Sequence, residues 1–180
     1  MRVLIAADIH GDREALLELL RREFDIFVIV GDLTNRYRER ELFKLLPEAT
    51  IFIPGNNEPP EAGVHGCVKE VGEYEFICLG GSLPTPFNTL FEIPDAEYGR
   101  ILSGMHAGRK TIVFSHCPPY GVLDRVGSKN IGSHALREFI EREKPLAVFV
   151  AHVHEHAGEL AFLDGIPVFN PGKKGLILEL

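Results

Sequence analysis

The side chains of this chain that are best suited to chemistry are Asp, Asn and His residues that directly follow short apolar runs. Carboxylate, amide and imidazole groups are hard and borderline ligands for divalent cations. Each such segment alone is a weak signal, but five of them in one chain indicate a pocket that binds metal ions. The five segments are Asp8-Ile9-His10, Gly31-Asp32, Gly55-Asn56-Asn57-Glu58, Ser115-His116 and Ala151-His152-Val153-His154.

The apolar runs that precede these segments predict the strands that position them. They occupy residues 3–7, 26–30, 51–54, 111–114 and 147–150. In open α/β sheets, sites form at the carboxyl ends of the strands, so we expect all five segments to meet at one edge. Because side chains alternate along a strand, His152 and His154 are expected on the same face.

Helical periodicity appears between these strands. It predicts helices over residues 13–22, around 42–46, over 96–103 and over 134–142. Asp12 and Ser133 are the expected caps of the first and last helices, and Pro47 ends the second. A hairpin is expected over residues 70–82, and short strands over 167–169 and 176–179. Residues 83–109 have a weak pattern, which leaves a lid over the pocket and a packed surface connection both open.

Length and composition describe an ordinary globular protein. The chain has 180 residues, of which 45% are hydrophobic and 25% charged, which predicts a single domain over residues 1–180. A net charge of -7 argues against an extended nucleic-acid surface, but not against a small phosphate substrate at a cation site. The three cysteines (Cys67, Cys78 and Cys117) predict free thiols. With no membrane span and no signal-peptide pattern, we expect a cytoplasmic protein that does not bind membranes.

The order of the five segments resembles the calcineurin-like metallophosphoesterase superfamily. The pattern there is Asp-x-His, Gly-Asp, Gly-Asn-His-Asp/Glu, a lone His and Gly-His-x-His, and the match runs from residue 8 to 154. Residues 115–121 with Asp124, residues 152–155 with Gly158, and Asn170-Pro171-Gly172 look like its small single-domain phosphodiesterase type, the metallophosphoesterase-domain branch. The resemblance implies an α/β fold, a four-layer α-β-β-α sandwich of two mixed sheets flanked by helices.

The resemblance also implies a role for each matching residue. Two divalent metal ions would be bound, with Mn²⁺ expected first and Fe, Ni²⁺, Zn²⁺ or Mg²⁺ left open. A hydroxide between the ions would be the nucleophile. One ion would be held by Asp8, His10, Asp32 and His154, and the other by Asp32, Asn56, His116 and His152. Asp32 would bridge the two ions, and the catalytic set would be Asp32, Asn56, Asn57 and His116.

Two positions depart from the family pattern. Asn57 stands where His is usual, and an amide cannot deliver a proton to a leaving group at neutral pH. This favours phosphodiesters. His65, His134 and His156 could each supply the missing acid, with His156 the best candidate, but an exposed or capping role is expected for all three. Ala151 stands where Gly is usual and would be strained at a positive φ.

The sequence thus predicts a metal-dependent phosphoesterase that acts on small phosphoesters, preferentially diesters. A nucleotide substrate and a homo-oligomer remain open. The alternative is a non-catalytic metal-binding scaffold for protein–protein interaction, like the retromer subunit of the same superfamily, and an apolar patch near residues 83–91 would favour it. A nuclease for short single strands is disfavoured by the acidic balance. Supporting expectations are that Glu58 and Glu155 orient ligands, that Cys117 is not a nucleophile, and that Arg36, Arg109, Arg125 and Lys129 are surface charges.

Overall fold

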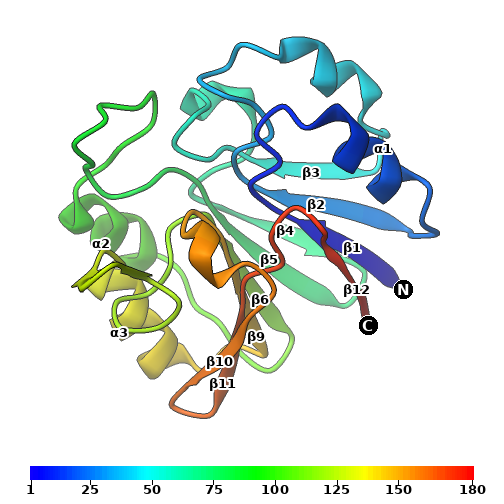
Figure 1. The fold of residues 1–180 in the computed structure, drawn as a ribbon. Coiled ribbons are helices and arrows are strands. Elements are labelled where there is room, and N and C mark those ends of the chain that lie inside the picture. Colours follow the sequence, from blue (N-terminus) through cyan, green and yellow to red (C-terminus); the bar gives the residue numbers. More distant parts are fainter.

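The computed structural model describes residues 1–180 and contains two β-sheets packed face to face, with helices on both outer surfaces (Figure 1). The first sheet has the strand order β12-β1-β2-β3. Its strands are β1 (Arg2–Ala6), β2 (Ile26–Val30), β3 (Thr50–Ile53) and β12 (Leu176–Glu179). β1, β2 and β3 are parallel, and β12 returns antiparallel to β1.

The second sheet has the strand order β10-β11-β9-β6-β5-β4. Its strands are β4 (Cys67–Val71), β5 (Tyr74–Leu79), β6 (Thr111–Ser115), β9 (Ala147–Val150), β10 (Leu160–Leu163) and β11 (Ile166–Phe169). The four central strands are parallel, and β4 and β10 are antiparallel edges. Both sheets are therefore mixed, as predicted.

Three apolar layers hold the sandwich together, and strand alternation explains them. Val3 and Ile5 of β1 face the second sheet, where they pack in one cluster with Phe76 and Phe114. Leu4 lies on the opposite face of β1 and packs under α1. The outer face of the second sheet packs against α2 and α3 through a third cluster. Because the central strands are buried on both faces, they are apolar without interruption, which made them visible in the sequence.

The α-helices agree with the prediction except for one. α1 (Arg13–Leu20) is capped by Asp12 and α3 (His134–Glu143) by Ser133, and α2 is Asp95–Ser103. The helix expected around residues 42–46 is instead a 3₁₀-helix, η1 (Arg40–Leu45). No side chain caps its start, and Pro47 follows closely, so the segment is too short for a stable α-helix. None of the helices has the length and apolar content needed to cross a bilayer.

Several short elements were not predicted from the sequence. The hairpin β7 (Arg125–Val126) and β8 (Lys129–Asn130) forms a separate two-stranded sheet, and β10 precedes the two predicted closing strands. The predicted hairpin exists but begins earlier, at β4, and turns at Gly72. Two more 3₁₀-helices, η2 (Pro60–Ala62) and η3 (His154–His156), lie in loops.

Candidate metal centre

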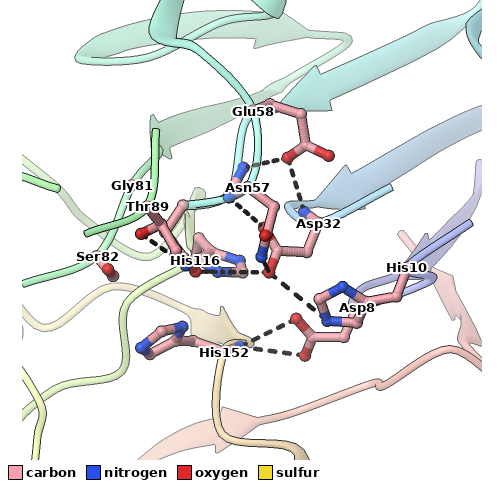
Figure 2. Close-up of polar contacts among 12 residues, drawn as sticks. Asp8, His10, Asp32, Asn57, Glu58, Gly81, Ser82, Thr89, His116 and His152 are labelled. Atoms are coloured by element: carbon pink, nitrogen blue, oxygen red, sulfur yellow. Dashed lines mark hydrogen bonds and ion pairs between the residues drawn. The ribbon is translucent and has the colours of Figure 1, made fainter. Parts of the chain in front are cut away.

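The five predicted segments meet where the two sheets open at the carboxyl ends of their parallel strands. Asp8 and His10 follow β1, Asp32 follows β2, and Asn56 and Asn57 follow β3. The second sheet contributes the segments that follow β6 and β9. Figure 2 shows that Asp8, His10, Asp32, Asn57 and His116 converge from these different loops. The prediction that these five segments lie at one edge is therefore confirmed.

Two overlapping groups of side chains have the spacing of a metal-binding cluster. One consists of Asp8, His10 and His154, and the other of Asp8, Asp32 and His116. In each group the ligand atoms lie within 4.8 Å of one another. Asp8 is common to both groups, so the two clusters adjoin.

The carboxylate of Asp32 lies between the histidines of the two groups. Its Oδ2 is 3.6 Å from Nε2 of His10 and 3.7 Å from Nε2 of His116. The same Nε2 atom of His10 lies only 2.8 Å from Nε2 of His154. Imidazole nitrogens that lie this close to a carboxylate and to each other are stable only when a proton or a cation is shared between them.

Backbone strain is concentrated at the same residues. Asp8 (φ 53), His10 (φ 49), Asp32 (φ 52) and His152 (φ 71) all adopt the left-handed region. Side chains other than glycine visit it rarely, at a cost of about 1–3 kcal/mol each. Ala151 does not adopt a positive φ, so the replacement of the usual glycine at that position causes no strain. Strain of this kind persists where the surrounding structure imposes it, and it is frequent at functional sites.

Two glycines allow the loops to approach each other closely. A Cβ atom on Gly31 would lie 2.1 Å from Nδ1 of His116, and one on Gly55 would lie 2.0 Å from Oδ1 of Asp32. Gly31 also has a φ of +86. The glycines of the Gly-Asp and Gly-Asn segments are therefore required by the site itself, because any side chain would displace a candidate ligand.

Hydrogen bonds orient the ligand atoms of His116 and Asn56. Nδ1 of His116 lies 3.0 Å from the carbonyl oxygen of Val30, which leaves Nε2 free to bind a cation. Nδ2 of Asn56 donates to Oγ1 of Thr89 at 3.0 Å, so the amide oxygen faces His116, where Oδ1 and Nε2 are 3.0 Å apart. Burial lowers the pKa of the His116 imidazole and favours its neutral, ligating form.

The electrostatics of the site fit divalent cations. Burial, and secondly the charge of Asp32, raises the pKa of the Asp8 carboxyl well above its ordinary value. Burial, and secondly the charge of the neighbouring His116, lowers the pKa of the His152 imidazole to about 3. Carboxylates buried close together are unfavourable in a protein interior. Together with neutral imidazoles, however, they form a donor set that a divalent metal ion stabilises.

Asn57 and Glu58 support Asp32 from the loop after β3. The backbone N–H of Asn57 donates to Oδ1 of Asp32 at 2.9 Å, and its Nδ2 donates to Oδ2 at 2.6 Å (Figure 2). The buried Glu58 carboxylate accepts hydrogen bonds from the backbone N–H groups of Asp32, Thr34 and Gly55 and from the Thr34 hydroxyl. Burial and the charge of Asp32 raise the pKa of Glu58 to about 7. Glu58 thus joins the loops that follow β2 and β3.

The family model of the calcineurin-like phosphoesterases matches residues 1–156, the segment that contains all five motifs. The chain belongs to this family. It is therefore a metal-dependent phosphoester hydrolase whose substrates are small phosphoesters, and the family implies divalent metal ions.

Two curated proteins and one solved structure are similar to this calcineurin-like phosphoesterase. Uncharacterized protein MJ1162 of Methanocaldococcus jannaschii is 26% identical over 176 residues, which cover 86% of this chain and 81% of the relative. UPF0046 protein K07C11.7 of Caenorhabditis elegans is 24% identical, with 89% of this chain and 66% of the relative covered. The crystal structure of TT1561 of Thermus thermophilus superimposes with a TM-score of 0.71 at 21% identity, covering 96% of this chain and 90% of that one. This last likeness shows the shared fold.

Other expectations about the phosphoesterase site need correction. The His-x-His segment is not on a strand, because β9 ends at Val150 and His154 begins η3. The His152 ring lies beside that of His116, with centroids 5.2 Å apart, and points away from Asp8 in Figure 2. It joins neither three-residue group, although its backbone N–H donates to the Asp8 carboxylate. The turn at His152 breaks the alternation on which the prediction relied.

None of the candidate acids points at the ligand groups. His156, in η3 and not on a continued strand, lies between Glu159 and the backbone N–H of Arg125. His65 accepts a hydrogen bond from the N–H of Gly80, and His134 stacks on Tyr120. Glu155, expected to orient a ligand, makes no hydrogen bond to a candidate ligand residue. Asp12 caps helix α1, as expected. Cys117 is buried with its pKa raised to about 12 by burial, as expected of a thiol without a nucleophilic role.

Sequence reasoning missed two residues that hold the site. The first is Thr89, the partner of Asn56, whose hydroxyl in turn donates to Glu92. The second is Glu92, which also accepts hydrogen bonds from the N–H and hydroxyl of Thr85 and from the N–H of Thr89. Both lie in the segment of weak pattern, residues 83–109, where no periodicity marks them. Only the cluster of Thr and Glu side chains in a loop could have suggested a closed turn.

Proposed function

We propose that this phosphoesterase hydrolyses phosphodiesters at a centre of two divalent metal ions. The observation that carries the proposal is the pair of adjoining ligand groups that share Asp8, with Asp32 between their histidines. Two cations held close together need shared anionic ligands to offset their repulsion. Ions bound there would supply Lewis acidity toward the phosphate and activation of water as the nucleophile.

The proposed ligand assignment is the one that the resemblance to the family implies. Asp8, His10, Asp32 and His154 are proposed to hold one ion, and Asp32, Asn56, His116 and His152 the other, with Asp32 as the bridge. The similar distances from Oδ2 of Asp32 to His10 and His116 support the bridging role. Rotation of the His152 side chain from its place beside His116 is part of the proposal. Manganese is proposed first among the candidate metals.

The preference for diesters rests on Asn57. Its amide lies at Oδ2 of Asp32, where it can donate a hydrogen bond to a phosphate oxygen but cannot protonate a leaving group. None of the three candidate histidines replaces it, because His65, His134 and His156 are engaged elsewhere. Esters with stabilised leaving groups, such as aryl and cyclic diesters, are therefore the proposed substrate type, and a nucleotide is compatible with it.

The experiment uses protein stripped with a chelator and reloaded with Mn²⁺. Hydrolysis of bis(p-nitrophenyl) phosphate is measured beside that of p-nitrophenyl phosphate, and bound metal is counted by mass spectrometry. We expect two ions per chain, metal-dependent turnover that favours the diester, and loss of both in Asp32→Ala. Asp12→Asn is the matched control, because Asn also caps helices well and Asp12 is no ligand. Thermal unfolding in chelator shows whether Asp32→Ala is folded.

A scaffold function is the second candidate, and one observation favours it. Phe87 and Leu90 are exposed, 71% and 49% respectively, in the segment where an interaction patch was expected. Two bound ions per chain without turnover of any ester would overturn the hydrolytic proposal and favour the scaffold. A single domain over residues 1–180 and a cytoplasmic location are two further proposals. The free thiols support the location, since thiols persist in reducing compartments.

A further inference from the structure

A cleft of about 410 Å³ opens directly beside the candidate metal centre. Asn56, His152 and His154 form the part of its lining that belongs to the centre. Its size falls within the usual range for small-molecule sites, about 300–1,000 Å³. The cleft therefore has room for one substituent of a phosphoester held at the metal centre.

The walls of the cleft are apolar and come from two segments outside the two large sheets. Leu83, Pro84, Pro86 and Phe87 form one wall, and Val126 and Ile131 form the other. Phe87 is 71% exposed and Val126, on β7, is 41% exposed. Large apolar side chains that face solvent across a cleft mark a binding groove, because a ligand seated there removes apolar surface from water.

The charge of the lining restricts what can bind. No Lys or Arg lines the cleft, and Glu155 is its one acidic side chain. A second phosphate or a carboxylate on the substituent would meet no cationic side chain in the lining and would face Glu155, while the Arg36 guanidinium is engaged with the carbonyl oxygen of Phe87. The cleft on the other side of Asp8 and His10 is different, because it is lined by polar groups that include Asp12 and Lys173.

Both walls are held in place without a ligand. Glu92 closes the turn that carries Phe87 through four hydrogen bonds from Thr85 and Thr89. The buried Asp124 carboxylate holds the β7–β8 hairpin by accepting hydrogen bonds from the N–H groups of Gly121 and Gly132 and from Asn130. A preformed cleft binds a rigid group with little loss of conformational entropy.

We propose that this cleft binds a neutral aromatic substituent of the phosphodiester substrate, between Phe87 and Val126. The proposal rests on the proposed function, because the phosphate must be held at the metal centre. An aromatic ring suits the apolar walls, and the absence of cationic side chains selects an uncharged one. A phenol-like ring and a nucleobase share this chemistry.

The test measures binding by calorimetry on the Mn²⁺-loaded protein, with ligands that are not hydrolysed. Monomethyl phenylphosphonate is compared with monomethyl methylphosphonate, both singly charged like a phosphodiester. We expect the phenyl ligand to bind at least tenfold more tightly. In Phe87→Ala and Val126→Ala that ratio falls to about threefold or less, while the affinity for the methyl ligand stays unchanged. Leu160→Ala is the matched control, because Leu160 is an exposed apolar residue on the edge strand β10 and does not line the cleft.

Each outcome separates the two proposals. Equal affinities for both phosphonates would overturn the aromatic cleft and leave the metal-centred phosphate site intact. Failure of both phosphonates to bind the metal-loaded protein would instead contradict the proposed function. Thymidine 5′-methylphosphonate in a third titration distinguishes the source of the ring: tighter binding than the phenyl ligand assigns the cleft to a nucleobase, and weaker binding assigns it to a simpler aromatic group.

Discussion

The side chain of Asn57 donates a 2.6 Å hydrogen bond from Nδ2 to Oδ2 of Asp32, the oxygen that lies between His10 and His116. The residue that replaces the usual histidine is therefore in the centre of the site and not at its margin. Its amide oxygen faces the other way and accepts a hydrogen bond from the N–H of Arg36 at 3.3 Å. This arrangement aims the donor end of the amide at the metal centre.

Substitution of Asn57 should separate phosphate binding from leaving-group protonation. Asn57→Ala removes one hydrogen bond to a charged group, so we expect kcat/KM for bis(p-nitrophenyl) phosphate to fall about tenfold. Asn57→His restores a group that can deliver a proton, so the dependence of rate on leaving-group pKa should become shallower across a series of substituted phenyl diesters. A dependence equally steep in the wild type and in Asn57→His would contradict the role assigned to Asn57.

The glycine before Asp32 offers a test that leaves every candidate ligand in the chain. A Cβ on Gly31 would overlap the His116 ring, so Gly31→Ala must displace that ring or the backbone, which also has a positive φ. We expect Gly31→Ala to lose at least one bound metal ion per chain, counted by mass spectrometry, and to lose turnover more than hundredfold. Gly104→Ala is the control, because nothing lies within 4 Å of its added Cβ. Full metal occupancy in Gly31→Ala would show that the approach of these loops is not required.

The elements that carry the ligands could be predicted from the sequence because those elements are simple. Strands such as β2 and β6 are buried on both faces, so they appear as unbroken apolar runs that end at Asp32 and His116. The caps of α1 and α3 were also readable, since Asp12 and Ser133 act on residues three positions away. Local signals of this kind suffice to predict the strand ends, and the candidate ligands directly follow those strand ends.

The parts that were missed depend on contacts between distant residues. The β7–β8 hairpin has two residues per strand and is held by Asp124, so no periodicity reveals it. The turn at His152 is imposed by hydrogen bonds to Asp8, which is 144 residues away in the chain. The same holds for the link from Asn56 to Thr89. Sequence patterns therefore brought the candidate ligands together but did not predict the orientation of His152 or the residues that hold Asn56.

Glu58 is expected to stabilise the loops of the site. Its buried carboxylate accepts hydrogen bonds from the backbones of Asp32, Thr34 and Gly55, and Glu58→Gln would turn an amide N–H₂ toward some of these donors. Leaving a buried donor unpaired costs about 1–3 kcal/mol, so we expect the free energy of unfolding to fall by about 2 kcal/mol. Urea unfolding in chelator measures this, with Glu61→Gln in the 3₁₀-helix η2 as the exposed control. An unchanged unfolding midpoint in Glu58→Gln would exclude this role.

Glu92 should influence the metal centre through Thr89 and Asn56. The Thr89 hydroxyl accepts from Nδ2 of Asn56 and donates to the Glu92 carboxylate, so it holds the amide oxygen of Asn56 toward His116. We expect Glu92→Gln to weaken the binding of one metal ion about tenfold, a typical effect for groups that orient ligands. Calorimetric titration with Mn²⁺ checks this, and Thr89→Val should have a similar effect whereas Thr50→Val, at the start of β3, should have none. Equal Mn²⁺ affinities in wild type and both site variants would contradict the link.

Glu92 also predicts how the stability of the metal-free chain depends on pH. Burial alone would raise its pKa, but the hydrogen bonds from Thr85 and Thr89 outweigh burial and lower it from 4.5 to about 2. Because the pKa is lower in the folded state, the ionised carboxylate stabilises the fold above about pH 4.5, and this contribution is lost as the pH falls toward 2. The difference in unfolding free energy between wild type and Glu92→Gln should therefore be constant above about pH 5 and shrink below about pH 4.5. Urea unfolding over a pH series measures it, and a difference that stays constant down to the acid limit of folding would mean that Glu92 is not held as an anion by this turn.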